Sequence, residues 1–239
     1  MALNLFLLFH KCGNNYVQDV HRRTEVPFVP SILPSDAGEI PQHDEKEQVT
    51  NIRCRNFDFD TLAQNSLLDR PGYRYVVFTR HPASFILSAV KYHRRGNEEW
   101  AANEPQPHLG GRSLTRALNQ AWTASRRQIH VMTHFKYLYE RQASLMSLLG
   151  SENVIRVKCE DIFAERDPAY YSELTRFLRL QAGETFVEAL KSASPAFKKK
   201  LPRHSTGEFA HSDPLARLGR RARDHYEKHW SGFATALEY

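Results

Sequence analysis

The stretch LFLLFHKCGNNYVQDV, residues 5–20, runs from an unbroken apolar segment into a lysine, a glycine and two asparagines. A continuous apolar run is typical of a parallel strand buried on both faces, so we predict a strand over residues 3–9. A helix is predicted over residues 14–23, because the proline at position 27 disfavours helix beyond it. In parallel sheets, ligands bind where a strand ends and a helix begins. The stretch therefore predicts both a fold and the place of its site.

The turn between this strand and helix has the composition of an anion-binding loop. Gly13 permits a tight turn and lets backbone N–H groups approach an anion, and the helix start leaves further N–H groups unpaired. Asn14 and Asn15 add side-chain donors, and Lys11 adds a mobile positive charge. It is not a Walker A loop, in which the lysine follows the second glycine. We predict a phosphate cradle; the alternative is a helix entry with a chance lysine.

A second strand-to-helix turn follows the same plan. Residues 73–79 (YRYVVFT) predict a strand, and Pro82 suits the first turn of a helix. Arg80 stands at the strand end, and Ser88 lies roughly two helical turns further on, so both can face one anion. An arginine after a strand is by itself usually a surface or ion-paired residue. The pair of turns, rather than Arg80 alone, indicates phosphate binding.

The rest of the chain alternates strands with helices, which predicts an α/β fold with a largely parallel sheet. The 239 residues suit a single domain, 1–239. Further strands are predicted near 26–29, over 49–54 and within 153–163. Helices are predicted at about 113–129, 134–149, 168–180, 183–192 and 214–237, with loops over 26–48, 96–112 and 194–213.

The net charge of +6, before twelve histidines are counted, suits an anionic ligand, a nucleic acid or a membrane surface. Basic residues are interleaved with acidic ones, which argues against nucleic-acid binding. Three widely spaced cysteines do not make a disulfide framework, which favours a reducing, cytoplasmic location. Residues 2–9 lack the flanks of a signal peptide and are too short for a transmembrane segment.

The order of these motifs resembles that of the sulfotransferases that use 3′-phosphoadenosine-5′-phosphosulfate (PAPS). The family's first loop, Pro-Lys-Ser-Gly-Thr-Thr-Trp, corresponds to residues 10–16, with Asn14 and Asn15 for the threonines and Tyr16 for the tryptophan. Its Arg-Asp-Pro and a serine eight residues after the arginine correspond to Arg80-His81-Pro82 and Ser88. More loosely, NVIRVKCEDIF (153–163) is similar to its strand ending in Tyr-Glu-Asp-Leu, and PRHSTGEF (202–209) to a late basic-glycine loop.

The resemblance implies a P-loop-NTPase-like three-layer fold with a central, mainly parallel sheet flanked by helices. It implies sulfuryl transfer from PAPS to a hydroxyl or amine, leaving adenosine 3′,5′-bisphosphate (PAP). Lys11 would stabilise charge on the leaving oxygen, and no metal is demanded. The implied nucleotide contacts are the 5′-phosphosulfate loop (Lys11, Cys12, Gly13, Asn14, Asn15), Tyr16 on adenine, Arg80 and Ser88 on the 3′-phosphate, and Arg203, His204 and Gly207 closing over.

Several residues are candidates for the general base. Asp58 is the first choice, because it lies 22 residues before Arg80, near the spacing of the family's cytosolic members. The alternatives are Asp60, Glu39 and His43. The acceptor is predicted to carry a hydroxyl on a carbohydrate, phenol, lipid or peptide, in a pocket built by residues 26–48 and 96–112.

Two other functions are alternatives to sulfuryl transfer. A P-loop-like small-molecule kinase shares the fold type, and a basic nucleic-acid-binding protein would use the charge. Histidines spaced i, i+4 (His130 with His134, His225 with His229) are interpreted as helix faces, because no third metal ligand is evident. The oligomeric state is not predicted.

Overall fold

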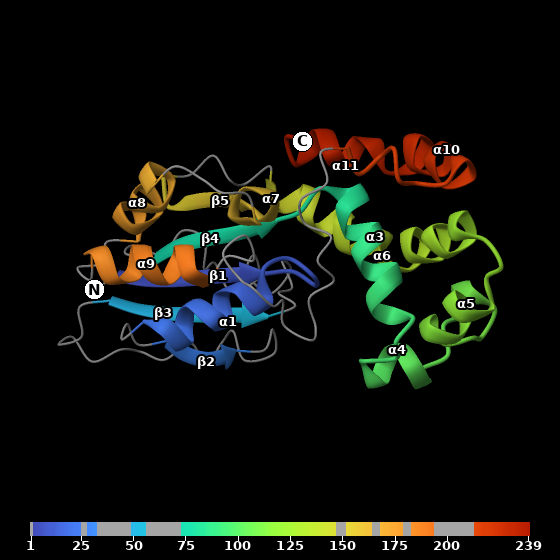
Figure 1. Cartoon of the computed structure of the whole chain (residues 1–239), viewed down its shortest axis with the longest axis horizontal. Coiled ribbons are helices and arrows are strands. Elements are labelled where there is room, and N and C mark those ends of the chain that lie inside the picture. The colour runs from blue at the N-terminus through green and yellow to red at the C-terminus, as the bar shows by residue number, and fades with distance from the viewer. Residues whose placement is uncertain are drawn as a thin grey trace. The chain divides into compact units, whose positions relative to one another are not determined.

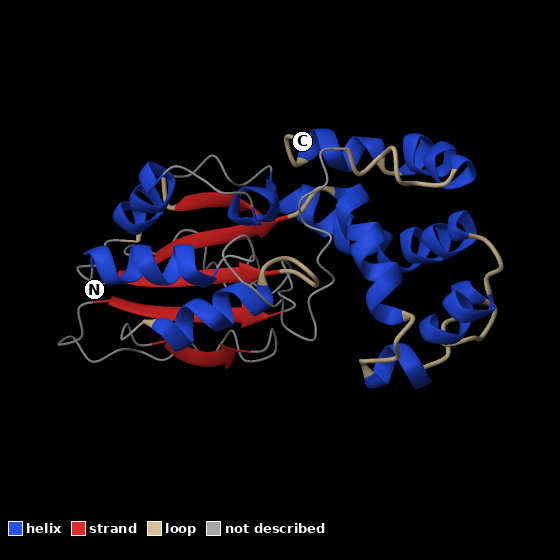
Figure 2. Ribbon diagram, in the orientation of Figure 1, coloured by secondary structure: helices blue, strands red, loops and turns tan. Residues whose placement is uncertain are grey.

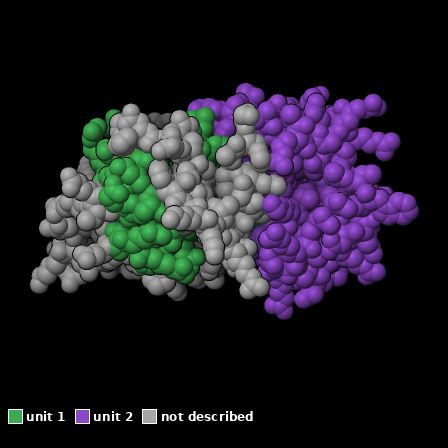
Figure 3. Space-filling model, viewed as in Figure 1, with its two compact units in different colours: residues 1–79, 147–200 green, residues 80–146, 201–239 purple. Residues whose placement is uncertain are grey.

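The structure, a computed structural model, describes residues 2–24, 28–32, 49–55, 73–146, 152–163, 168–178, 183–193 and 213–239. The chain divides into two compact units, which Figure 3 shows in green and purple. Unit 1 comprises Met1–Thr79 and Ser147–Lys200, and unit 2 comprises Arg80–Met146 and Leu201–Tyr239. Each unit takes two separate stretches of chain. The single domain over 1–239 stays a prediction, and each unit is described by itself.

Unit 1 contains a five-stranded parallel sheet in the order β2-β3-β1-β4-β5 (Figures 1 and 2). The strands are β1 (Ala2–Leu8), β2 (Phe28–Ile32), β3 (Val49–Arg55), β4 (Tyr73–Thr79) and β5 (Val154–Lys158). From β1 the chain goes to β2 on one side, and from β4 it goes to β5 on the other. The carboxyl ends of β1 and β4 therefore mark the topological switch point, the place where open α/β sheets bind ligands.

The predicted strands are confirmed: β4 has the predicted bounds, and the ends of the others differ by at most three residues from those predicted. The apolar run of β1 is buried, with Leu7 and Leu8 fully inaccessible, because β3 and β4 flank it on both sides. β3 forms in spite of its two arginines, and β2 begins two residues later than predicted.

The helices in the described part of unit 1 are α1 (Asn14–Arg23), α7 (Cys159–Phe163), α8 (Pro168–Phe177) and α9 (Gly183–Ala193). α1 has the predicted bounds. The hydroxyl of Tyr16 donates a 3.0 Å hydrogen bond to the carbonyl of Leu190, which joins α1 to α9. The amide of Asn4 donates at 3.0 Å to the carbonyl of Leu178, which joins β1 to the end of α8. Segments far apart in sequence thus fix the start of the sheet.

The described part of unit 2 is helical (Figure 2). Its elements are α3 (Pro82–His93), α4 (Glu99–Asn103), the 3₁₀ turn η3 (Pro107–Leu109), α5 (Leu114–Gln120), α6 (Ala124–Met146), α10 (Arg220–His229) and α11 (Ser231–Ala236). The long helix α6 contacts α3, α5, α10 and α11. Phe85 of α3 packs edge-on against Phe135 and Tyr139 of α6, with ring centroids 5.2 and 5.1 Å apart.

Three helix predictions in unit 2 are wrong in their bounds. The predicted loop 96–112 contains α4 and η3. The predicted helices 113–129 and 134–149 divide elsewhere, because Thr123 caps a new helix by accepting a 3.2 Å hydrogen bond from the Arg126 N–H. The predicted helix 214–237 breaks at Trp230, whose buried ring packs against Tyr139 at 4.9 Å.

Among the described residues, no helix is both long enough and apolar enough to cross a membrane. The thiols of Cys12 and Cys159 are buried and not in disulfides. The cytoplasmic location stays a prediction.

Candidate functional site

The turn from β1 into α1 has two residues with positive φ, Lys11 at 61° and Gly13 at 78°. The N–H of Cys12 donates at 3.0 Å to the carbonyl of Phe9 and closes the turn. A Cβ at position 13 would lie 2.7 Å from Cδ1 of Phe78 on the neighbouring strand β4. Two constraints therefore favour glycine at position 13: the left-handed backbone conformation, and the lack of space for a Cβ beside β4.

This turn leaves the start of α1 open. In the described part of the chain no side chain caps α1, and its first turn holds no acidic residue. Lys11 and Asn14 are half-buried and Asn15 is exposed. Oδ1 of Asn14 is buried without a hydrogen-bond partner among the described residues. The helix start, with its positive dipole end, thus fits the predicted phosphate cradle.

Two residues of the predicted loop, Cys12 and Tyr16, are buried and pack within unit 1. The thiol of Cys12 is fully buried, and its N–H is already used within the turn. Tyr16 is 4% exposed and packs against Phe78 with ring centroids 6.4 Å apart, while its hydroxyl bonds to Leu190. In this structure the ring of Tyr16 is packed in the core, and its stacking on adenine stays a prediction.

The turn from β4 into α3 supplies Arg80, the residue directly after the last residue of β4. Arg80 is 1% exposed, and its carbonyl accepts a 3.2 Å hydrogen bond from the hydroxyl of Tyr139. Ser88, on α3, is fully buried. Charge-assisted hydrogen bonds are strong in such a desolvated place, so this pair is chemically suited to a phosphate.

His81 explains the departure from the family's Arg-Asp-Pro. Its Nδ1 accepts a 3.1 Å hydrogen bond from the N–H of Ala83 and so caps α3, the work that an aspartate does at this position. Burial lowers the pKa of His81 to about 4, although Asp213 acts to raise it. The neutral ring is the form that can accept, so the low pKa keeps the cap in place near neutral pH.

The register of the sheet places the ends of β1 and β4 side by side. Leu8 pairs with Phe78, two residues before Arg80 in the chain. Both predicted turns therefore leave neighbouring strands at the switch point. This adjacency comes from the strand order of the sheet, in which β4 pairs with β1.

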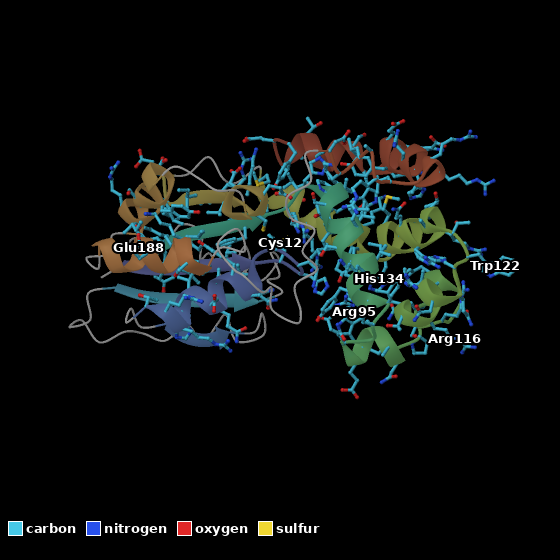
Figure 4. The ribbon with its side chains drawn as sticks, viewed as in Figure 1. Cys12, Arg95, Arg116, Trp122, His134 and Glu188 are labelled. Carbon is cyan, nitrogen blue, oxygen red and sulfur yellow. The ribbon has the colours of Figure 1, made fainter. Side chains whose placement is uncertain are left out.

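Unit 2 contains a cluster of aromatic and histidine rings, two of which the sequence places in the predicted acceptor loop 96–112. Trp100 and His108 were predicted in the acceptor loop, and both contact His134 of α6. Trp100 stacks on His134 with centroids 5.4 Å apart, and Nε2 of His108 lies 2.9 Å from Nδ1 of His134. Burial, and then the neighbouring His108, lower the pKa of His134 to about 4. His134 is thus part of a packed cluster that fixes residues 96–112 on α6; Figure 4 shows its position.

Several predicted residues lie outside the described part of the chain. They are the base candidates Asp58, Asp60, Glu39 and His43, and the late-loop residues Arg203, His204 and Gly207.

The fold is the P-loop-like α/β fold found in sulfotransferases, as the sequence predicted. One solved structure with this fold is mouse sulfotransferase SULT7A1 complexed with PAP. It matches with a TM-score of 0.59 and 12% sequence identity, over 100% of this chain and 88% of that chain. No protein-family model matches the sequence, and no curated protein does. At this identity the similarity shows the fold alone.

Proposed function

We propose that this protein is a sulfotransferase, which moves a sulfuryl group from PAPS to a hydroxyl or amine of an acceptor and releases PAP. The observation that carries the proposal is the open start of α1, which Lys11 and Gly13 precede at the switch point of the sheet. The fold of a PAP-bound sulfotransferase supports it. The enzyme class, the donor and the acceptor are all part of this proposal.

The donor set of the loop suits a nucleotide phosphate. Residues 10–18 contain no carboxylate and offer a lysine, two asparagines and the amides of a helix start. In the proposed site the backbone from Gly13 to Asn15 holds the 5′-phosphate, while Arg80 and Ser88 hold the 3′-phosphate. A sulfuryl group carries less charge than a phosphoryl group, so a lysine can serve without a metal.

Lys11 is the proposed catalytic residue of the loop. PAPS supplies the sulfuryl group, and negative charge develops on the oxygen that leaves with PAP. A cation beside that oxygen lowers the barrier more than it strengthens ground-state binding, which is the electrostatic form of catalysis. Cys12 shapes the turn, and the contacts of Arg203, His204 and Gly207 remain predictions.

The proton of the acceptor needs a base. Asp58 remains the first candidate, with Asp60, Glu39 and His43 as alternatives. The acceptor class, whether carbohydrate, phenol, lipid or peptide, is decided by transfer of labelled sulfate from PAPS to a panel with one member of each.

Thermal unfolding with four ligands tests the proposal. PAP should raise the melting temperature, because a ligand that binds only the folded state stabilises it. Adenosine 5′-monophosphate, which lacks the 3′-phosphate, should stabilise much less. Stabilisation by ATP with magnesium but not by PAP would favour the kinase, and by a random oligonucleotide alone the nucleic-acid-binding protein.

A further inference from the structure

A cleft of about 420 Å³ lies between α3 and the first turns of α6. Its walls carry four cationic side chains, one from α3, two from the residues directly after α3 and one from α6, and we call it the basic cleft. Both helices belong to unit 2. The residues that matter here are Lys91 of α3, Arg94 and Arg95 directly after it, Arg127 of α6, and the apolar pair Leu87 and Val90 of α3.

The cleft lies in the unit that carries the chain's positive charge. Residues 80–146 and 213–239 hold 15 lysines and arginines against 8 aspartates and glutamates, an excess of seven. The whole chain has 33 against 27, so the remaining residues together carry a charge of about minus one. The basic character that the sequence showed as a scattered property is a property of the helical unit.

Two arginines of the basic cleft, Arg95 and Arg127, have few side-chain partners among the described residues. Arg95 makes no side-chain hydrogen bond or ion pair there, and Nε of Arg127 is buried without a hydrogen-bond partner. Nε of Arg94 has a long contact, 3.4 Å, to Oδ1 of Asn119. No described residue that lines the cleft is a carboxylate. Like charges held together are unfavourable, and a bound anion would reverse that.

The wall formed by α6 is held in place from behind. Gln128 is buried, and its Oε1 accepts a 3.0 Å hydrogen bond from the N–H of Gly219. Its Nε2 donates to the carbonyl of Arg217 at 3.4 Å. These bonds fix the first turns of α6 to the segment before α10. The cleft therefore exists before any ligand arrives, which reduces the ordering cost of binding.

We propose that the basic cleft binds an acid group, a sulfate, phosphate or carboxylate, carried on an apolar ring or chain. Cations on both walls can grip the acid group from two sides, as arginines commonly do. Leu87 and Val90 provide an apolar surface for the ring or chain. The volume lies within the range of small-molecule sites. The proposal concerns residues of unit 2 only and does not depend on sulfuryl transfer.

Calorimetric titration of the full chain tests the cleft, with saturating PAP present in one series and absent in the other. The probes are inorganic sulfate, an aryl sulfate, a sulfated disaccharide and the same disaccharide without sulfate. The cleft variant is Arg95→Ala with Arg127→Ala. The matched control is Arg116→Ala with Arg126→Ala, which removes the same charge from exposed arginines outside the cleft lining. Figure 4 shows Arg116 away from Arg95.

The aryl sulfate or the sulfated disaccharide should bind the wild type more tightly than inorganic sulfate or the unsulfated sugar. The cleft variant should lose about tenfold or more in affinity, the scale of one charge-assisted hydrogen bond, while the control changes by less than about twofold. PAP should still stabilise the cleft variant, which keeps this proposal separate from the nucleotide site.

Equal losses in both double variants would show diffuse surface charge and overturn the proposal. Absence of binding by every sulfated probe would do the same, as would equal binding of the unsulfated sugar. Sulfate binding as tight as that of the organic sulfates would contradict the ligand class. A random oligonucleotide could instead bind more tightly than the aryl sulfate and the sulfated disaccharide, and only when Arg95 and Arg127 are intact. That result would assign the cleft to nucleic acid.

Discussion

The turn from β1 into α1 and the turn from β4 into α3 both lead from a buried parallel strand into a helix, but they end differently. Gly13 turns the first in a left-handed conformation and leaves the helix start without a side-chain cap. His81 closes the second by accepting the N–H of Ala83. The first turn can therefore offer backbone donors to an anion, whereas the second must use the side chains of Arg80 and Ser88.

This difference separates two kinds of binding. Backbone amides fix the position of a group closely and cost little to order, whereas a buried arginine supplies charge. In the proposed site, backbone amides hold the 5′-phosphate of the nucleotide and a buried arginine holds its 3′-phosphate. The predictions below act on one turn at a time, so each tests whether the two turns divide the work in this way.

Lys11→Ala should have the largest effect. We expect kcat to fall about 10²-fold or more, the scale of losing one donor to a developing negative charge. PAP affinity should change far less, because the charge is needed mainly in the transition state. Single-turnover transfer from labelled PAPS measures the loss of rate, and calorimetry measures the PAP affinity. Lys11→Arg is the control that keeps the charge; near-normal turnover of the alanine variant would remove Lys11 from the mechanism.

Gly13→Ala should destabilise the fold by about 2–4 kcal/mol, from a strained φ and from overlap with Phe78. Gly111→Ala is a matched control, because Gly111 also has positive φ, 74°, yet a Cβ there meets nothing within 4 Å. Urea denaturation of both should show the larger loss at position 13. Equal losses would mean that the contact with β4 does not matter and that the backbone conformation alone requires the glycine.

Arg80→Ala should weaken PAP binding by about tenfold to a hundredfold, the loss of one or two charge-assisted hydrogen bonds to a phosphate. The affinity for adenosine 5′-monophosphate should fall much less, since that ligand lacks the 3′-phosphate. Arg80→Lys should retain part of the PAP affinity, because it keeps the charge but not the two-pronged grip. An alanine variant that binds PAP as the wild type does would refute the assignment of Arg80.

His81 should show the smallest effect, and one that depends on pH. In the unfolded chain His81 takes up a proton near its ordinary pKa of 6.5, whereas in the folded chain it does so only near 4. Stability from this residue is therefore present above pH 6.5 and is lost as the pH falls toward 4. His81→Ala should cost about 0.5–2 kcal/mol at pH 7.5, the value of a helix cap.

His81→Asp is the matched variant for that experiment. An aspartate accepts the same N–H while ionised, so it should keep the cap at pH 7.5 and lose less stability between pH 6.5 and 4.5. His134, whose pKa is also about 4, adds a loss of the same sign that both proteins share. Identical pH profiles for the wild type and His81→Asp would show that His81 does not titrate as its burial implies.

The sequence was informative wherever a single local pattern decides the structure. The apolar run of β1, the bounds of α1 and the proline that begins α3 are such patterns, and the two turns follow from them. The adjacency of those turns depends on the strand order of the sheet, in which β4 lies next to β1.

It was not informative where distant residues decide. Tyr16 has the sequence position of a base-stacking ring, but its hydroxyl bonds to a carbonyl 174 residues away. α4 has five residues, too few for a periodic pattern to reveal, and its Trp100 is held by His134. Lys91, Arg94 and Arg95 look like an ordinary solvated helix end until α6 places Arg127 opposite them.

The helix α3 separates Arg80 from the arginines of the basic cleft by a fixed distance. Arg80 lies two residues before the first residue of α3, and Arg94 follows directly after its last. At 1.5 Å per residue, these two arginines are separated by about 20 Å along the helix axis. A single phosphate or sulfate cannot reach both. The length of one rigid helix therefore fixes how far apart two acidic groups must be in any ligand that engages both ends of α3.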